Sequence, residues 1–210
     1  MQTKTMERLQ YISQGQTLAE QKSNILKALD AGSKWIQIRW KEASNKQLYI
    51  LAEQIKQACS EFDAYCIIND YPEIAKDIDA DGVHLGLDDC RIIAARDLLG
   101  PEKIIGGTAN SFADVKQRIL ENCDYIGLGP FGYTTTKQKL SPLLGIAGYK
   151  NIIQQVRQEG LPSIPIFAIG GIKDLEDIHH LTQIGVYGIA LSGMITQTPH
   201  IVSSINKLLV

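Results

Sequence analysis

Residues 65–85, YCIINDYPEIAKDIDADGVHL, contain the unit from which the fold can be inferred. Tyr65–Asn69 and Gly82–Leu85 are short apolar runs of the kind that form buried strands. Between them, Pro72–Ile78 leaves room for one short helix that begins at a proline. A strand, a helix and a second strand in direct succession are typical of a parallel sheet whose faces are covered by helices.

The same alternation continues in both directions along the chain. Further strands are predicted at Leu9–Ile12, Trp35–Arg39, Lys103–Gly107, Tyr125–Leu128, Ile164–Ile169 and Gly188–Leu191. Further helices are predicted at Leu18–Leu29, Asn45–Phe62 (with Ser44 as its N-cap), Cys90–Leu99, Ser111–Leu120, Ile146–Gln158, Leu175–Thr182 and Ile201–Leu209. Eight strand–helix units favour a closed barrel, and no linker interrupts them. We therefore predict one α/β domain over residues 1–210, a single (β/α)8 TIM barrel.

The composition excludes several classes of partner. The chain has 210 residues, 44% of them hydrophobic, and its 21 Lys+Arg against 23 Asp+Glu give a net charge of −2. Without a basic excess, neither nucleic acid nor an anionic membrane surface is an expected partner. There is no leader-like apolar segment and no run of the ~20 apolar residues that a membrane span needs, so we expect a cytoplasmic protein. A homo-oligomer is compatible with the sequence.

The four cysteines show no metal-site spacing. Cys59, Cys66, Cys90 and Cys123 contain no CxxC pair, and the histidines have no ligand spacing either. We expect all four cysteines to be small buried residues. His84 lies inside an apolar strand, where a hydrogen-bonded core histidine is the expected role.

In a barrel of this kind, chemistry takes place where the strands end and the following loops begin. Gln37, Arg39 and Lys41 alternate with period two at the end of their strand, which places them on one face. If that face is the barrel interior, two cations point into the mouth. The alternative is a solvated strand end.

Carboxylates follow the next two strands. Asp70 comes directly after Asn69, and Asp88 and Asp89 follow the strand that ends at Leu85. Two carboxylates at one rim are suited to Mg²⁺, which keeps much of its shell for water and phosphate. Alternatively, the Asp88–Asp89 pair caps the following helix. We expect each aspartate to serve one of these purposes, with Asp89 as the metal ligand.

Three later loops have features of phosphate sites. The hydroxyl-rich segment Thr134–Lys137 ends in a cation, and glycines follow the last two strands at Gly170–Gly171 and Ser192–Gly193. Hydroxyls and exposed backbone N–H groups can hold an anion. The alternative for the threonine segment is an idle surface loop.

These residues resemble the thiamine-phosphate synthase family, also called thiamine-phosphate pyrophosphorylase. The matching segments run in order over nearly the whole chain: Gln37–Lys41, Ile68–Asp70, Ala80–Asp89, Asp124–Pro130, Thr134–Lys137, Ala168–Ile172 and Gly185–Gly193. The resemblance implies a (β/α)8 barrel that joins a hydroxymethylpyrimidine diphosphate to a thiazole phosphate, with release of pyrophosphate.

The resemblance also implies roles for individual residues. It implies that Arg39, Lys41 and Lys137 act on the diphosphate and that Asp70 and Asp89 hold Mg²⁺. The remaining implied substrate contacts are Gln37, Asn69 and Thr108 for the pyrimidine diphosphate, and Thr134, Thr136, Gly171, Ser192 and Gly193 for the thiazole phosphate. The expected partners are therefore small phosphorylated molecules.

The sequence departs from the family pattern at a few positions. The family often has His at position 110, Gln at 87 and an acidic residue soon after Lys137, whereas this chain has Asn110, Leu87 and Gln138–Lys139. A thiazole tautomerase paralogue, which uses a histidine at position 110, is therefore disfavoured. A binder of thiamine precursors without turnover is the second alternative.

Overall fold

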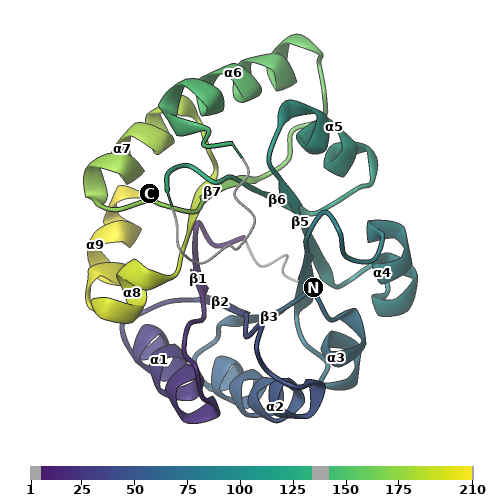
Figure 1. The fold of residues 1–210 in the computed structure, drawn as a ribbon, viewed down its shortest axis with the longest axis vertical. Helices are drawn as coiled ribbons and strands as arrows, with labels where there is room; N and C mark the ends of the chain where they lie inside the picture. Colours follow the sequence, from purple (N-terminus) through teal and green to yellow (C-terminus); the bar gives the residue numbers. More distant parts are fainter. Residues whose placement is uncertain (1–5, 134–141, 210) are drawn as a thin grey trace.

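The computed structural model describes residues 6–133 and 142–209 and shows eight parallel strands closed into a barrel. Each strand pairs with its neighbours in sequence, and β1 pairs with β8 to complete the ring (Figure 1). The strands are β1 Leu9–Ile12, β2 Trp35–Ile38, β3 Tyr65–Asn69, β4 Gly82–Leu85, β5 Ile104–Ala109, β6 Tyr125–Leu128, β7 Ile166–Ile169 and β8 Gly188–Leu191. The predicted (β/α)8 fold is confirmed.

Helices surround the strands as an outer ring (Figure 1). They are α1 Leu18–Asp30, α2 Asn45–Glu61, α3 Pro72–Asp77, α4 Ile92–Leu99, α5 Phe112–Leu120, α6 Gly145–Gln158, α7 Leu175–Ile184, α8 Gly193–Gln197 and α9 Ile201–Leu208. Ser44 caps α2 as predicted, with its hydroxyl accepting from Gln47 N at 3.3 Å. Within the described residues, none of these helices is both long enough and apolar enough to cross a bilayer.

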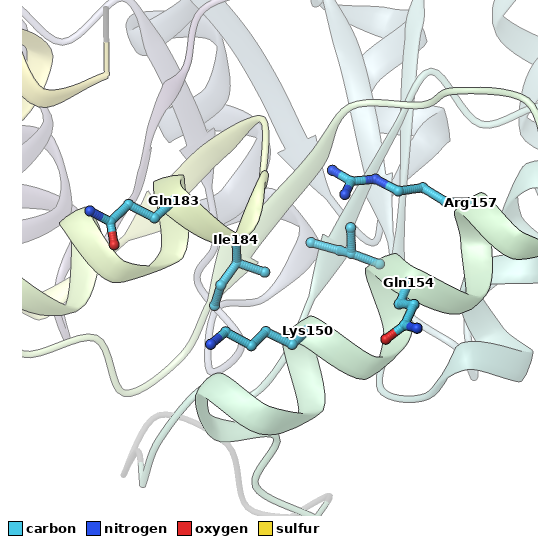
Figure 2. A pocket seen from close by; sticks show the side chains of 6 residues that line it. Lys150, Gln154, Arg157, Gln183 and Ile184 are labelled. Atoms are coloured by element: carbon cyan, nitrogen blue, oxygen red, sulfur yellow. The ribbon is translucent and has the colours of Figure 1, made fainter.

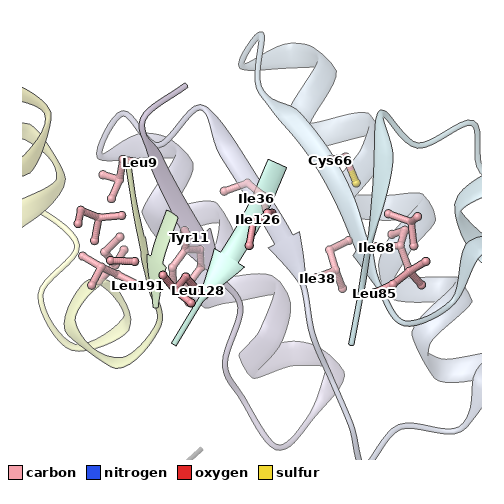
Figure 3. Packing of buried hydrophobic residues seen from close by; sticks show 14 of the residues in the cluster. Leu9, Tyr11, Ile36, Ile38, Cys66, Ile68, Leu85, Ile126, Leu128 and Leu191 are labelled. Atoms are coloured by element: carbon pink, nitrogen blue, oxygen red, sulfur yellow. The ribbon is translucent and has the colours of Figure 1, made fainter. Parts of the chain in front are cut away.

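The strands divide their side chains between two apolar layers. Residues such as Ile36 and Ile38 pack outward against the helices, as the buried cluster in Figure 3 shows. The alternate positions fill the barrel interior, where Trp35, Tyr125 and Phe167 pack with ring centroids 5.2–5.6 Å apart. Since Gln37 is two residues after Trp35 on β2, it also belongs to the interior face.

Most differences from the predicted boundaries are small and have local causes. β2 ends at Ile38 because Arg39 donates its N–H to Ser13 Oγ at 2.9 Å, not to a neighbouring strand. β7 begins at Ile166 because Pro165 has no N–H to donate to the ladder. The sequence did not predict α8, whose five residues are too few for a periodic signal.

Two expectations near α4 are wrong. The helix begins at Ile92 with Arg91 as its N-cap and no capping side chain, so neither Asp88 nor Asp89 caps it. Cys90 is exposed because it lies in the turn before the helix, whereas the other three cysteines are buried as expected.

Candidate active site

The predicted polar residues gather at the carboxyl ends of β2, β3, β4 and β5, on one side of the barrel mouth. Gln37 and Asn69 lie on interior faces and are buried, with 2% and 8% of their surface exposed. Arg39 and Thr108 are half-buried at the ends of their strands. The mouth therefore contains a buried polar floor beneath more accessible side chains.

Lys41 and Asp70 form an ion pair across this rim. Lys41 Nζ lies 2.5 Å from Asp70 Oδ2, and the side chains are 49% and 14% exposed. Asp70 has a left-handed backbone, with φ of 70°, and donates its N–H to the His84 carbonyl at 2.9 Å. A non-glycine residue held in this region at a strand end is a frequent feature of functional sites.

Asp89 lies beside this pair. Its Oδ2 accepts a hydrogen bond from Gly86 N at 2.6 Å, which holds the carboxylate against the end of β4. Burial raises the pKa of Asp89, the neighbouring Asp70 carboxyl raises that pKa further, and the Gly86 N–H and Lys41 oppose the rise. Two adjacent carboxylates whose proximity makes ionisation costly are suited to share a divalent cation.

Asp70 and Asp89 fit Mg²⁺ by their chemistry. Both offer hard oxygen ligands, and two carboxylates leave positions for diphosphate and water. Among residues 6–133 and 142–209, no group of three or more His, Cys, Asp or Glu side chains is arranged to enclose a metal. The pair therefore resembles an open site that a phosphorylated substrate completes.

Replacing Asp89 by asparagine is expected to raise the melting temperature of the metal-free protein near pH 7. The folded-state pKa of Asp89 lies above its unfolded value, so its contribution to stability falls as the pH rises from about 4 through the folded pKa. Asparagine removes the ionised carboxylate but keeps an oxygen for the Gly86 N–H. Thermal unfolding in chelator, measured from pH 7 down to pH 4, should show the gain shrinking with acidification. A gain that is independent of pH would contradict this origin.

A buried chain of polar side chains lies behind the rim. His84 is 4% exposed, with Nε2 3.0 Å from Thr108 Oγ1 and Nδ1 3.0 Å from the Tyr125 hydroxyl. Gln37 Nε2 donates to Gln10 Oε1 at 3.3 Å in the same interior. His84 is the hydrogen-bonded core histidine that the sequence predicted, but its link to Thr108 was not predicted.

The glycine turns lie on the other side of the mouth, because β7 and β8 are opposite β3 and β4 in the closed ring. Gly171 has φ of 75°, and an added Cβ would lie 2.3 Å from the Gly132 carbonyl carbon, so only glycine permits this approach. Ser192 and Gly193 follow β8 and are half-buried.

Gln14 is a residue that the sequence reasoning missed. A Cβ added at Gly193 would be 3.7 Å from Gln14 Oε1, so this exposed side chain borders the glycine turn. The Gln14 carbonyl accepts from Asn24 Nδ2 at 2.8 Å, which anchors the loop. Gln14 comes two residues after β1, so the rule that strand ends carry function could have found it.

Asn110 has a structural role at the rim. Its side-chain amide donates to the carbonyl oxygens of Gly129 and Ala109, and its N–H donates to Asp114 Oδ2 at 2.9 Å. An amide does not transfer protons near neutral pH, so the site lacks the acid/base group that a tautomerase would place here.

The predicted residues Thr134, Thr136 and Lys137, together with Gln138 and Lys139, lie outside the described residues. Elsewhere, a surface groove of about 350 Å³ lies between α6 and α7, with Lys150 and Arg157 on one side and Gln183 on the other (Figure 2). This groove belongs to the outer helical layer and contains none of the predicted site residues.

Comparisons with known proteins identify the family of this chain. The family model described as thiamine monophosphate synthase matches residues 9–195. A thiamine-phosphate synthase of Flavobacterium psychrophilum is 53% identical over 203 residues, covering 95% of this chain and 98% of the relative. One from Bacteroides fragilis is 48% identical over 182 residues, covering 87% of this chain and 88% of the relative.

A solved structure of a protein from this family is also similar to this chain. Thiamine phosphate pyrophosphorylase from Pyrococcus furiosus superposes with a TM-score of 0.81 at 26% identity, covering 97% of this chain and 96% of the other. With a matching family model over most of the chain and close relatives of the same length, this chain belongs to the thiamine monophosphate synthase family.

Proposed function

We propose that this protein forms thiamine phosphate by transferring a pyrimidine methylene group from its diphosphate to the nitrogen of a thiazole phosphate. The C–O bond to the diphosphate breaks first, and its electron pair leaves with pyrophosphate. The aminopyrimidine ring stabilises the resulting methylene cation, and the thiazole nitrogen then forms the new C–N bond. The observation that carries this proposal is the Lys41, Asp70 and Asp89 cluster beside Asn69 at one rim.

Residues at the carboxyl ends of β2 to β5 would bind the diphosphate and assist its departure. Arg39 and Lys41 would neutralise the leaving group, and Asn69 and Thr108 would donate hydrogen bonds to it. Asp70 and Asp89 would hold Mg²⁺, which when bound offsets negative charge on the departing pyrophosphate. Lys41 Nζ is paired with Asp70, and a diphosphate bound at this rim would compete with that carboxylate for the lysine.

The thiazole phosphate would bind at the opposite rim, with contacts from Gly171, Ser192 and Gly193. The two anion sites then lie on opposite sides of the mouth, and the reacting carbon and nitrogen meet between them. Such alignment of two bound reactants accounts for a large part of the catalysis that this chemistry needs. Gln37, on the floor of the mouth, would face the pyrimidine.

Turnover by the purified chain tests the proposal. The protein is mixed with pyrimidine diphosphate, thiazole phosphate and Mg²⁺, and pyrophosphate and thiamine phosphate are measured over time. Equal amounts of both products are expected, and neither should form in chelator. Tight binding of either precursor without turnover would instead identify a binding protein, and isomerisation of the thiazole alone would identify a tautomerase.

Replacing Lys137 by alanine is expected to lower kcat by about 10²-fold and to weaken diphosphate binding, because a cation that meets the leaving group stabilises the transition state. Steady-state kinetics and pyrophosphate titration measure the two effects. Lys139→Ala, which removes the same charge two residues away, should change both much less. An effect of Lys137→Ala on melting temperature alone would support the idle-loop alternative.

A further inference from the structure

We propose that His84 and Tyr125 are positioning residues that hold the Thr108 hydroxyl as a hydrogen-bond donor toward the substrate diphosphate. This inference rests on the proposed contact between Thr108 and that diphosphate. His84 is 4% exposed and Tyr125 is fully buried, and the effect that we assign to them reaches the diphosphate through Thr108.

The three side chains form a continuous chain across β4, β5 and β6. His84 Nε2 is 3.0 Å from Thr108 Oγ1, and His84 Nδ1 is 3.0 Å from the Tyr125 hydroxyl. A neutral imidazole donates from one ring nitrogen and accepts at the other. The direction of one bond in the chain therefore determines the direction of the other.

The surroundings of Tyr125 determine that direction. Burial raises the pKa of this phenol far above its usual value, so it keeps its proton. The hydrogen bond that the described structure gives to this hydroxyl joins it to His84 Nδ1, at 3.0 Å. The phenol hydrogen then has His84 Nδ1 as its acceptor, since a buried O–H without an acceptor is unfavourable.

This assignment has a consequence at the rim. If Nδ1 accepts from Tyr125, the ring hydrogen is on Nε2 and is donated to Thr108 Oγ1. Thr108 then cannot direct its own hydrogen toward the histidine, so that hydrogen is available for an acceptor in the mouth. A phosphate oxygen is such an acceptor, whereas the opposite tautomer would leave a lone pair facing the anion.

The barrel makes room for this chain with glycines on the flanking strands. A Cβ at Gly106 would lie 2.1 Å from Tyr125 Cζ, and a Cβ at Gly127 would lie 3.1 Å from His84 Cε1. Both rings thus occupy space that larger residues on β5 and β6 would fill. Each ring therefore depends on a glycine of a neighbouring strand for its space.

The first test is the tautomer of His84 in the whole protein. Long-range ¹H–¹⁵N correlation of histidine-labelled protein distinguishes the protonated ring nitrogen, and His84→Gln identifies which signals belong to His84. We expect hydrogen on Nε2 and none on Nδ1 in the wild type, and a loss of this preference in Tyr125→Phe. Hydrogen on Nδ1 in the wild type would overturn the proposal.

The second test is kinetic and uses variants that keep the packing. Tyr125→Phe should lower kcat/KM for the pyrimidine diphosphate by about 10-fold, with KM for the thiazole phosphate unchanged. Thr108→Val should lower the same kcat/KM at least as much. The double variant should be no worse than Thr108→Val alone, because both substitutions remove the same hydrogen bond to the diphosphate. His84→Gln, whose amide can still donate toward Thr108, should retain more activity than His84→Leu.

Tyr187→Phe is the matched control. It also removes a tyrosine hydroxyl from an aromatic cluster, but that hydroxyl donates to the Met6 carbonyl before β1, at the other end of the barrel. It should leave the His84 tautomer and kcat/KM unchanged. Additive effects of Tyr125→Phe and Thr108→Val, or wild-type kinetics in either, would overturn the inference. If the wild type turns over both substrates, such results leave the proposed function standing, whereas an inactive wild type refutes the function.

Discussion

Replacing Asp89 by asparagine is expected to lower Mg²⁺-dependent thiamine phosphate formation by about 10²–10³-fold. Asparagine keeps the size of the side chain and an acceptor for Gly86 N, so the loop after β4 retains its hydrogen bond. The lost carboxylate leaves Asp70 as the remaining proposed ligand for a divalent ion, and charge on the departing pyrophosphate is then poorly offset. Steady-state rates measured across a Mg²⁺ titration give both the loss in kcat and the shift in metal dependence.

Asp88→Asn is the control for this prediction. Asp88 carries the same charge one residue earlier and is exposed, so its loss changes the local charge without removing a proposed ligand. Its rates and Mg²⁺ dependence should match those of the wild type. If Asp89→Asn also retained wild-type kcat at saturating Mg²⁺, Asp89 would not be a metal ligand in the reaction.

Replacing Gly171 by alanine is expected to lower kcat/KM for the thiazole phosphate by about 10²-fold, because displacement of a positioning loop by about 1 Å has effects of this size. An added Cβ would lie 2.3 Å from the backbone of Gly132, so one of the two loops must move. Those loops follow β7 and β6, where the second anion is proposed to bind. The loss should appear mainly in KM for the thiazole phosphate, with a smaller change in the KM for the pyrimidine diphosphate.

Gly160→Ala is the control for Gly171→Ala. It tests the cost of a left-handed backbone without a close contact to a second loop. Gly160 also has a left-handed backbone, with φ of 62°, but no atom lies within 4 Å of an added Cβ. This variant should lose only the roughly 1 kcal/mol that alanine costs in that conformation and keep full activity. Equal kinetics and equal melting temperatures for the two variants would show that the Gly171–Gly132 approach is unimportant for the site.

Much of one rim was predictable from local patterns. Gln37 shares the face of Trp35 through period-two alternation, and Asn69 and Asp70 come directly after an apolar run. The rule that function lies at strand ends was sufficient to bring these residues together. The helix-capping alternative for Asp88 and Asp89 was also plausible from the sequence, and the contact between Asp89 and Gly86 N was needed to decide against it.

Other features required the packed barrel. His84 and Tyr125 are 41 residues apart in the chain, and His84 and Thr108 are 24 apart, so no local pattern indicates that they touch. The same is true of Gln14 and Gly193, which meet because β1 and β8 close the ring.

The features that the sequence predicts depend on short-range interactions, and the features that it does not predict depend on long-range ones. Strand, helix and layer depend on backbone preferences and on the spacing of apolar residues over a few positions, and the amino-acid order contains both. Which polar atoms meet inside the mouth depends on the register between strands and on the space left by glycines such as Gly106 and Gly127. Those quantities take definite values only when eight strands close and the interior packs, so the direction of the hydrogen bond at Thr108 is a property of the whole barrel.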